Sequence, residues 1–329
     1  MTDLDLSYVD RELAERVNAS MTEVEHQLRE SVRSDYPFVA ETSRHLVDAG
    51  GKRFRPLLVL LAAELGKPQS PGVVPSAVVV ELTHLATLYH DDVMDEAALR
   101  RGAASANARW DNTVAILTGD FLFSRASDIL ADLGPEAVRI QARTFERLVI
   151  GQIKETVGPA DGDDPVEHYL AVVAGKTGSL IATAGRFGAL MSGASSDVVE
   201  LMARFGEHIG VAFQLADDLI DVTSDSEQSG KTPGTDLREG LRTLPVLHAL
   251  ASTDPADAEL QELLNSDLAD DRRHARTLAL LRASEAMKRA DADLRRHAEE
   301  ARRVLVPLPL GPAKLALEGL CDLVVARNS

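Results

Sequence analysis

Residues 75–95 read PSAVVVELTHLATLYHDDVMD, and this stretch indicates the fold class. Its apolar residues recur at helical spacing until the run ends in three aspartates, Asp91, Asp92 and Asp95. Residues 209–221, IGVAFQLADDLID, repeat this passage from an apolar helix to an acidic end. Helical spacing recurs elsewhere along the chain, while alternating β-branched runs are scarce. The sequence therefore predicts an all-α protein.

Clusters of Gly, Pro and Asp separate the segments that carry this helical pattern. The predicted helices cover residues 10–32, 56–65, 75–89, 113–133, 137–155, 166–174, 180–191, 198–221 and 275–304. The predicted breaks fall at residues 50–51, 68–71, 134–135, 158–165 and 224–233. Because no Pro/Gly/Ser-rich linker divides the sequence, we expect one domain, a helical bundle that spans residues 1–329.

The composition is acidic, with enough apolar residues for a large core. Of 329 residues, 52 are acidic and 35 are basic, which gives a formal net charge of −17. Nucleic-acid binding is not expected, because it needs a concentrated basic surface. The sequence holds a single cysteine, Cys321, and no apolar run of the roughly 18 residues that would cross a bilayer. We therefore expect a cytoplasmic protein without a disulfide or a transmembrane segment.

Each aspartate cluster reads D-D-x-x-D, and on a helical projection each forms one polar stripe. Carboxylates about 4 Å apart repel by about 4 kcal/mol at an effective dielectric of about 20, so two such rows at the ends of core helices favour bound cations. Oxygen ligands favour Mg²⁺, whereas the single cysteine leaves a zinc site without its usual ligands. The predicted metal ligands are Asp91, Asp92, Asp95, Asp217, Asp218 and Asp221.

Basic residues accompany the aspartates in the sequence. Residues 50–56 read GGKRFRP, which places Lys52 and Arg55 in a glycine turn before a helix expected to begin at Pro56. The free N–H groups of such a helix start favour anions, so this turn is a candidate phosphate site. The other candidate phosphate-binding cations are Arg100, Arg101, Lys176 and Lys231. Together with divalent metal ions, these charges suit about two diphosphates of roughly −3 each.

Other chemistries fit the residues less well. The Gly-Lys-Thr strings at residues 175–177 and 230–232 lack the glycine that a P-loop needs upstream of its Gly-Lys pair. Glu81 and His84 supply only half of the paired Glu-x-x-His signature of a di-iron bundle. No G-x-S-x-G nucleophile motif occurs, and Cys321 lies in an apolar segment where we expect it to be buried.

These motifs, in this order, resemble those of the trans-isoprenyl diphosphate (polyprenyl) synthases, in particular the long-chain bacterial type. The matching stretches are residues 50–56, 82–102, 119–120, 175–177, 213–221 and 230–245. The resemblance implies an all-α bundle around a deep central cavity, usually homodimeric. It also implies a transferase that joins isopentenyl diphosphate head-to-tail to an allylic diphosphate with Mg²⁺. Contact with a membrane surface is compatible with an apolar product, although no basic amphipathic helix demands it.

The resemblance also implies a role for each matching residue. Both aspartate rows would hold Mg²⁺, three ions in all, against the allylic diphosphate, from opposite walls of the cavity. The residues implied for binding isopentenyl diphosphate are Lys52, Arg55, His84 and Arg101, and Gly51 is a further substrate-binding candidate. Those implied for contacting the allylic diphosphate are Arg100, Lys176 and Lys231. Thr177 and Gln214 would flank the reacting centre.

The implied mechanism needs no protein nucleophile. Cations stabilise the leaving diphosphate while the allylic C–O bond ionises, and the isopentenyl double bond attacks the carbocation. The departed diphosphate would remove the final proton, in agreement with the lack of an obvious general base. One departure from the family pattern is Leu241, which stands where Lys is common; Arg242 follows it, about 100° further around an ideal helix.

Product length is expected to depend on side chains below the first aspartate row. A helical projection places Val80, Thr83 and Thr87 below this row, and none of them is aromatic. The cavity is therefore not blocked early, and a product of about six or more isoprene units is expected. The candidate length-controlling residues are Thr83, Ala86, Thr87 and Phe145. Three alternatives stay open: a shorter-chain synthase making farnesyl or geranylgeranyl diphosphate, a terpene cyclase, and a non-catalytic subunit of a heteromeric synthase.

Overall fold

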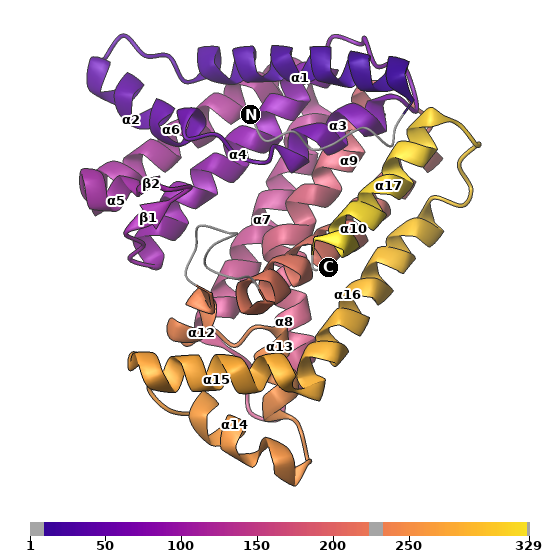
Figure 1. The fold of residues 1–329 in the computed structure, drawn as a ribbon. Coiled ribbons are helices and arrows are strands. Elements are labelled where there is room, and N and C mark those ends of the chain that lie inside the picture. The colour runs from indigo at the N-terminus through magenta and orange to yellow at the C-terminus, as the bar shows by residue number, and fades with distance from the viewer. Residues whose placement is uncertain (1–9, 224–232, 328–329) are drawn as a thin grey trace. The chain divides into compact units, whose positions relative to one another are not determined.

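The computed structural model describes residues 10–223 and 233–327. Lys231 and most of the predicted break at residues 224–233 lie outside this range. The described chain is helical apart from its loops and two short strands, β1 (Leu99–Arg100) and β2 (Ala103–Ala104), as Figure 1 shows. The predicted all-α class is confirmed.

The colour in Figure 1 follows the helices from the N-terminus to the C-terminus, and their bounds are as follows. They are α1 (Arg11–Ser31), α2 (Pro37–Asp48), α3 (Phe54–Ala63), α4 (Val73–Met94), α5 (Ala106–Arg109), α6 (Asn112–Leu133), α7 (Pro135–Val157), α8 (Pro165–Val173), the π-helix η1 (Ala174–Gly178), α9 (Ser179–Met191), α10 (Ser196–Thr223), α12 (Thr235–Arg238), α13 (Leu244–Leu250), the 3-10 helix η2 (Pro255–Asp257), α14 (Ala258–Leu264), α15 (Asp271–Ala283), α16 (Glu285–Val304) and α17 (Pro312–Ala326).

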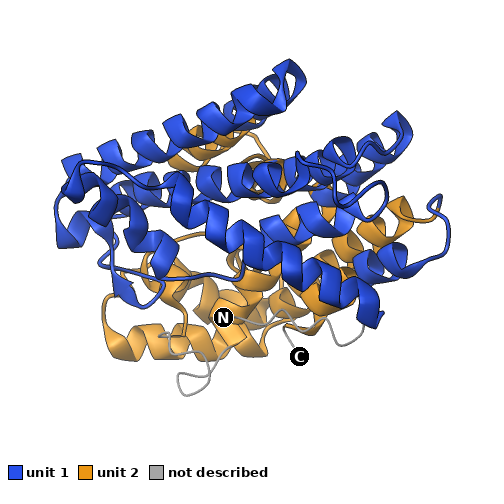
Figure 2. Cartoon of the chain, turned by 90° about the horizontal axis from the view of Figure 1, so that it is seen from above, with its two compact units in different colours: residues 1–146, 180–206, 307–319 blue, residues 147–179, 207–306, 320–329 orange. Residues whose placement is uncertain are grey.

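The chain divides into two compact units, which Figure 2 distinguishes by colour. Unit 1 comprises residues 1–146, 180–206 and 307–319, and unit 2 comprises residues 147–179, 207–306 and 320–329. Because the chain passes between the units several times, neither unit is a continuous segment. The single-domain organisation expected from the sequence stays a prediction.

Most predicted helices are present with ends shifted by a few residues, but the predicted helix at residues 275–304 is wrong as a single element. It is two helices, α15 and α16, separated at Ser284, whose backbone is extended (φ −81°, ψ 159°). The Ser284 hydroxyl donates to the Leu281 carbonyl at 2.7 Å, so the serine competes for the backbone of the preceding turn. No glycine or proline marks this break, and the helical pattern continues across it.

Polar caps explain why several helices begin where they do. The Asp10 carboxylate accepts from the Leu13 N–H at the start of α1, and Asp111 does the same for Val114 at the start of α6. Asp164 caps α8, with Pro165 as the first helical residue. Each cap satisfies backbone donors that the first helical turn leaves unpaired.

The core of unit 1 surrounds α4, which packs against α1, α3 and α6. The α4 side chains from Ala77 to Thr83 are buried, and α3 is buried along most of its length. Burial of apolar area contributes about 25 cal/mol per Å², so this central helix is strongly held in place. The first aspartate row therefore projects from a rigid element.

The core of unit 2 is a separate apolar cluster built from α10, α12, α13, α14, α15 and α16. Its buried members are Val222, Leu237, Val246, Ala249, Leu260, Leu268, Leu278, Leu281 and Ala286. Val222 directly follows the second aspartate row, so this cluster anchors the end of α10. As predicted, Cys321 is buried. Among the described residues, no helix combines the length and apolar character that a membrane crossing requires.

Candidate functional site

The first aspartate row lies at the carboxyl end of α4, in unit 1. Asp92 is fully buried, whereas Asp95, which caps the helix, is exposed. The Arg100 guanidinium donates to Asp92 Oδ1 at 2.5 Å and lies 3.9 Å from Asp95 Oδ2. The other oxygen, Asp92 Oδ2, is buried and has no hydrogen-bond partner within the described chain. A buried carboxylate oxygen without a partner is unfavourable, and a cation would compensate it.

The pKa of Asp92 agrees with this environment. Burial raises the pKa, while the charge and hydrogen bond of Arg100 lower it, and the net shift is upward. A bound divalent cation would favour the charged form further. The chemistry of this row, oxygen donors without sulfur or nitrogen, therefore fits Mg²⁺.

The β1–β2 hairpin positions the two arginines that follow this row. The strands pair Arg100 with Ala103, so Arg101 and Gly102 form a two-residue turn, and both have positive φ (53° and 78°). Such turns match the twist of a hairpin. Arg100 reaches the aspartates, while Arg101 donates to the carbonyls of Leu46 and Gly50. Arg100 and Arg101 are adjacent in the sequence, but one contacts the first aspartate row and the other contacts backbone carbonyls.

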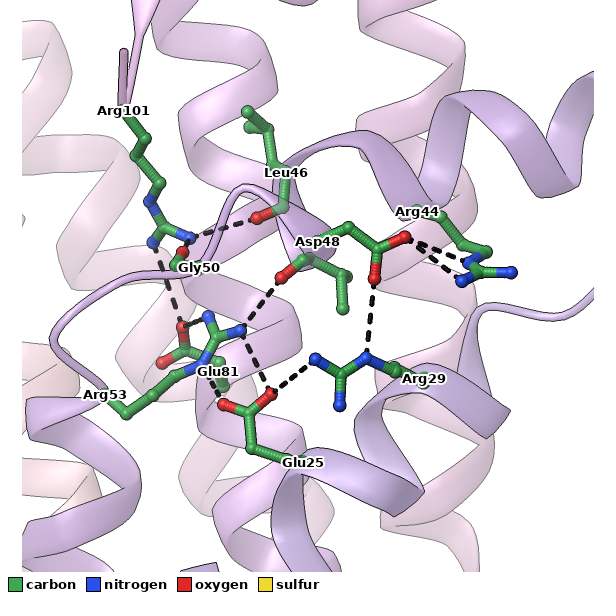
Figure 3. A network of polar contacts seen from close by, with 10 residues as sticks. Glu25, Arg29, Arg44, Leu46, Asp48, Gly50, Arg53, Glu81 and Arg101 are labelled. Carbon is green, nitrogen blue, oxygen red and sulfur yellow. Dashed lines mark hydrogen bonds and ion pairs between the residues drawn. The ribbon is translucent and has the colours of Figure 1, made fainter. Parts of the chain in front are cut away.

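The glycine turn before α3 differs from its predicted form. The helix begins at Phe54, so Pro56 is its third residue and not its first. Arg53 precedes the helix with a left-handed backbone (φ 50°), and its guanidinium lies 2.5 Å from Glu25 and 2.7 Å from Glu81 (Figure 3). Arg53 thus pairs with carboxylates of α1 and α4.

The residues expected to bind isopentenyl diphosphate gather around this turn. A Cβ atom on Gly51 would lie 2.8 Å from Arg101 Cζ, so only glycine allows the arginine this close to the turn. Burial, followed by the charges of Arg55 and Arg101, holds the pKa of His84 well below its usual value. His84 is therefore neutral beside Arg55 and Arg101. Lys52 is exposed beside them.

The candidate length-controlling residues also lie in unit 1. Thr83 and Ala86 are buried, and the Thr83 hydroxyl accepts a hydrogen bond from Gln141 at 2.8 Å. Phe145 is partly exposed, and its ring lies 4.6 Å from that of Phe123. The structure thus shows a buried small residue at position 86, while control of product length by these residues stays a prediction.

The second aspartate row lies on α10, in unit 2. Asp218 is 2% exposed; Tyr169 donates to one of its oxygens, and the Gln214 amide donates to the other at 3.1 Å. Burial raises the pKa of Asp218 to about 7, although both hydrogen bonds act in the opposite direction. Asp221 accepts from the backbone N–H groups of Thr235 and Asp236 at 3.2 Å each.

Lys176 and Thr177 lie in η1, a short π-helical interruption of the kind that often occurs at functional sites. The Thr177 hydroxyl donates to the Gln214 side chain at 3.2 Å, which brings together the two residues expected beside the reacting centre. Lys176 is paired with Glu155 at 2.6 Å. A Cβ on Gly151 would lie 2.7 Å from the Lys176 nitrogen, so α7 approaches η1 closely because glycine is present there.

Sequence reasoning missed two residues that contact the second row. Tyr169 donates to Asp218, and Arg327 near the carboxyl end pairs with Asp217. The Arg327 guanidinium also lies over the Phe213 ring at 4.6 Å from its centroid. Neither belongs to a motif quoted above. A buried carboxylate such as Asp218 needs a polar partner. Nothing in the sequence indicates which residue supplies this partner.

The loop that departs from the family pattern is not helical. Leu241 and Arg242 are both exposed and lie between α12 and α13. The rotation of about 100° expected for a helix therefore does not apply to Arg242. Lys231, the other cation expected near this row, lies outside the described residues.

Comparisons with known proteins give a family model, curated relatives and solved structures that are similar to this chain. The family model described as polyprenyl synthetase matches residues 36–281. A nonaprenyl diphosphate synthase of Mycobacterium tuberculosis is 49% identical, over 97% of this chain and 96% of that protein. The solved structure of geranylgeranyl pyrophosphate synthase from Corynebacterium glutamicum, complexed with calcium and isoprenyl diphosphate, has a TM-score of 0.87 at 48% identity and covers 97% of this chain and 98% of its own. A decaprenyl diphosphate synthase structure from Rhodobacter capsulatus has a TM-score of 0.87 at 34% identity, over 97% and 99% of the two chains.

Proposed function

Because the chain belongs to the polyprenyl synthetase family, we propose that it joins isopentenyl diphosphate head-to-tail to an allylic diphosphate in a Mg²⁺-dependent reaction. Family membership makes it a prenyl transferase with the helical fold of isoprenyl diphosphate synthases. The observation that carries the proposal is Asp92, a fully buried carboxylate whose Oδ2 has no hydrogen-bond partner among the described residues. The calcium and isoprenyl diphosphate named for the solved relative support a divalent cation and an anionic prenyl substrate.

The aspartates of both rows would hold the cations, three Mg²⁺ in all, against the allylic diphosphate. When bound, Mg²⁺ would supply the positive charge that stabilises the leaving diphosphate. Arg100 already lies against the first row and is suited to contact the same diphosphate. Lys176 and Lys231 would supply further positive charge, and Lys176 would exchange Glu155 for the substrate. The proposal requires both rows to act on one substrate molecule.

Isopentenyl diphosphate would bind at the cations near the glycine turn. Lys52, Arg55 and Arg101 would contact its phosphates, and neutral His84 would offer a hydrogen bond without adding charge. Gly51 keeps the backbone close to the Arg101 guanidinium. This arrangement would orient the isopentenyl double bond for attack on the allylic carbon.

Carbon–carbon bond formation would follow ionisation of the allylic C–O bond. Thr177 and Gln214, which are hydrogen-bonded to each other, would lie beside the carbocation and present oxygen atoms to its positive charge. The departed diphosphate would take the proton that is lost when the new double bond forms. Buried apolar surroundings would exclude the water that otherwise quenches the cation.

We further propose a long product of about six or more isoprene units. Ala86 is buried and small, which leaves room for a growing chain where a larger side chain would restrict it. The nonaprenyl and decaprenyl synthases among the relatives favour this assignment. A geranylgeranyl product is the second candidate, because a solved relative of 48% identity carries that name.

A homodimer is the assembly that we propose. Helix α7 exposes a run of apolar side chains on one face in unit 2, including Ile153 (55% exposed) and Val157 (77% exposed). Val149 lies one turn before Ile153, so the three residues recur at helical spacing. Exposed apolar patches of this kind mark protein interfaces more often than free surface.

A coupled assay of diphosphate release tests the proposed function. Purified protein alone, given isopentenyl diphosphate, an allylic diphosphate and Mg²⁺, is expected to release inorganic diphosphate. Release should cease when Mg²⁺ is removed by a chelator and resume when it is restored. If the purified chain is inert until a second protein is added, it is one subunit of a heteromeric synthase instead.

A further inference from the structure

A second group of potential metal ligands lies in unit 2. His208 on α10 and His297 and Glu300 on α16 each offer one ligand atom, and these atoms lie within 4.8 Å of one another. His297 and Glu300 are three residues apart and so share one face of α16. His208 precedes Asp217 on α10 by a helical rise of about 13.5 Å, so the group is distinct from the second aspartate row.

His297 provides the clearest sign that this group could bind a ligand. Both of its ring nitrogens, Nδ1 and Nε2, are buried and have no hydrogen-bond partner in the described part of the chain. A neutral imidazole carries one donor and one acceptor, so two polar atoms are left uncompensated. Asp293, one turn away, pairs instead with His248 at 2.8 Å and with Arg296 at 2.9 Å.

The other two residues have the spacing of ligands around one metal ion. His208 Nδ1 lies 3.2 Å from Glu300 Oε2. Two ligands bound at zinc distances in a tetrahedral site are about 3.3 Å apart. An ordinary hydrogen bond would also explain this pair, but it would leave both nitrogens of His297 uncompensated. The side chains of His208 and Glu300 are 34% and 38% exposed, so solvent ions can reach the group.

We propose that His208, His297 and Glu300 bind a transition-metal ion such as Zn²⁺, with water as the fourth ligand. Imidazole nitrogens select such ions over Mg²⁺, which prefers oxygen ligands. The bound ion would cross-link α10 to α16 within unit 2. The proposal does not depend on the catalytic role of either aspartate row.

Titration with Co²⁺ in excess Mg²⁺ tests this site, because nitrogen-ligated, four-coordinate Co²⁺ absorbs far more strongly in the visible than the ion in water. Full-length protein stripped of metal is expected to develop this absorption with a single equivalent, and added Zn²⁺ should abolish it. His297→Gln is expected to weaken binding by more than about 100-fold, since loss of a supporting residue outside the ligand set already costs 10- to 100-fold. Circular dichroism verifies that the variant is folded, and Glu300→Gln provides the same test if it is not.

Two matched controls separate this site from other metal binding. His26→Gln removes an exposed histidine on α1, and Asp217→Asn alters the second aspartate row. Both variants are expected to keep the Co²⁺ absorption. The proposal is overturned if the wild-type protein shows no such absorption, if His297→Gln retains it, or if Asp217→Asn loses it.

Discussion

At the scale of single residues, a network of buried and partly buried ion pairs surrounds the turn before α3. Glu81 is the central example in unit 1, because it is 2% exposed and lies 2.7 Å from Arg53 and 3.9 Å from Arg101 (Figure 3). Arg53 is in turn held by Glu25 at 2.5 Å. The network fixes the turn that carries the candidate isopentenyl diphosphate residues, so its integrity affects both stability and binding.

Glu81→Gln is expected to reduce the free energy of unfolding by about 3 kcal/mol, because it removes a buried negative charge from between two arginines. Equilibrium unfolding in urea measures this change. The matched control is Glu15→Gln, whose partner Arg11 is 91% exposed, and the expected loss there is less than about 1 kcal/mol. Equal losses in the two variants would contradict the role given to burial.

The protonation of Asp218 makes a second prediction at this scale. Since burial raises its pKa to about 7, a proton competes with Mg²⁺ for this carboxylate at lower pH. The affinity of the second row for Mg²⁺ is therefore expected to fall by about tenfold for each pH unit below 7 and to be nearly constant above it. Titrations of Mg²⁺ dependence across pH measure this profile.

Tyr169→Phe is expected to move that profile to higher pH. The lost hydrogen bond stabilises the charged form of Asp218. Its removal should therefore raise the pH below which the Mg²⁺ affinity falls by about one to two units. The control is Tyr36→Phe, which alters a side chain that is 64% exposed. A shift to lower pH in Tyr169→Phe would contradict the assigned donor.

At the scale of elements, the sequence predicted what depends on local pattern. The apolar run of α4 and the acidic ends of α4 and α10 were predictable, because helical periodicity and residue type suffice for them. The break at Ser284 was not, because an extended serine between two helical patterns leaves no glycine or proline signal. Nor could the sequence reveal Tyr169 or Arg327 as partners of the second row, since contacts between distant segments depend on packing.

Helix α4 also carries the test of product length. Ala86→Phe is expected to shorten the main product, because the larger side chain would occupy space that the growing chain requires. Chromatography of the dephosphorylated products measures their length. Ala86→Ser is the control, with little added volume and an unchanged product expected. An unchanged product from a folded Ala86→Phe variant would show that the side chain at position 86 does not limit product length.

At the scale of the whole molecule, the feature that bears on assembly is the apolar surface of α7. The exposed apolar face of α7 predicts that Ile153→Asp weakens the homodimer, because a charge would be buried at the interface. Sedimentation velocity is expected to show a dimer for the wild-type protein and a larger monomer fraction for the variant. The control is Lys154→Asp, at the neighbouring position on a different face of the helix. A monomeric wild-type protein would refute the proposed assembly.

The most direct test of the central claim is the product formed from radiolabelled isopentenyl diphosphate, an allylic diphosphate and Mg²⁺ by the purified chain. The account predicts polyprenyl diphosphates of about six or more isoprene units, and it predicts that Asp92→Asn and Asp218→Asn each abolish elongation in a folded protein. Full elongation by either variant, or no elongation by the wild-type protein, would contradict the account.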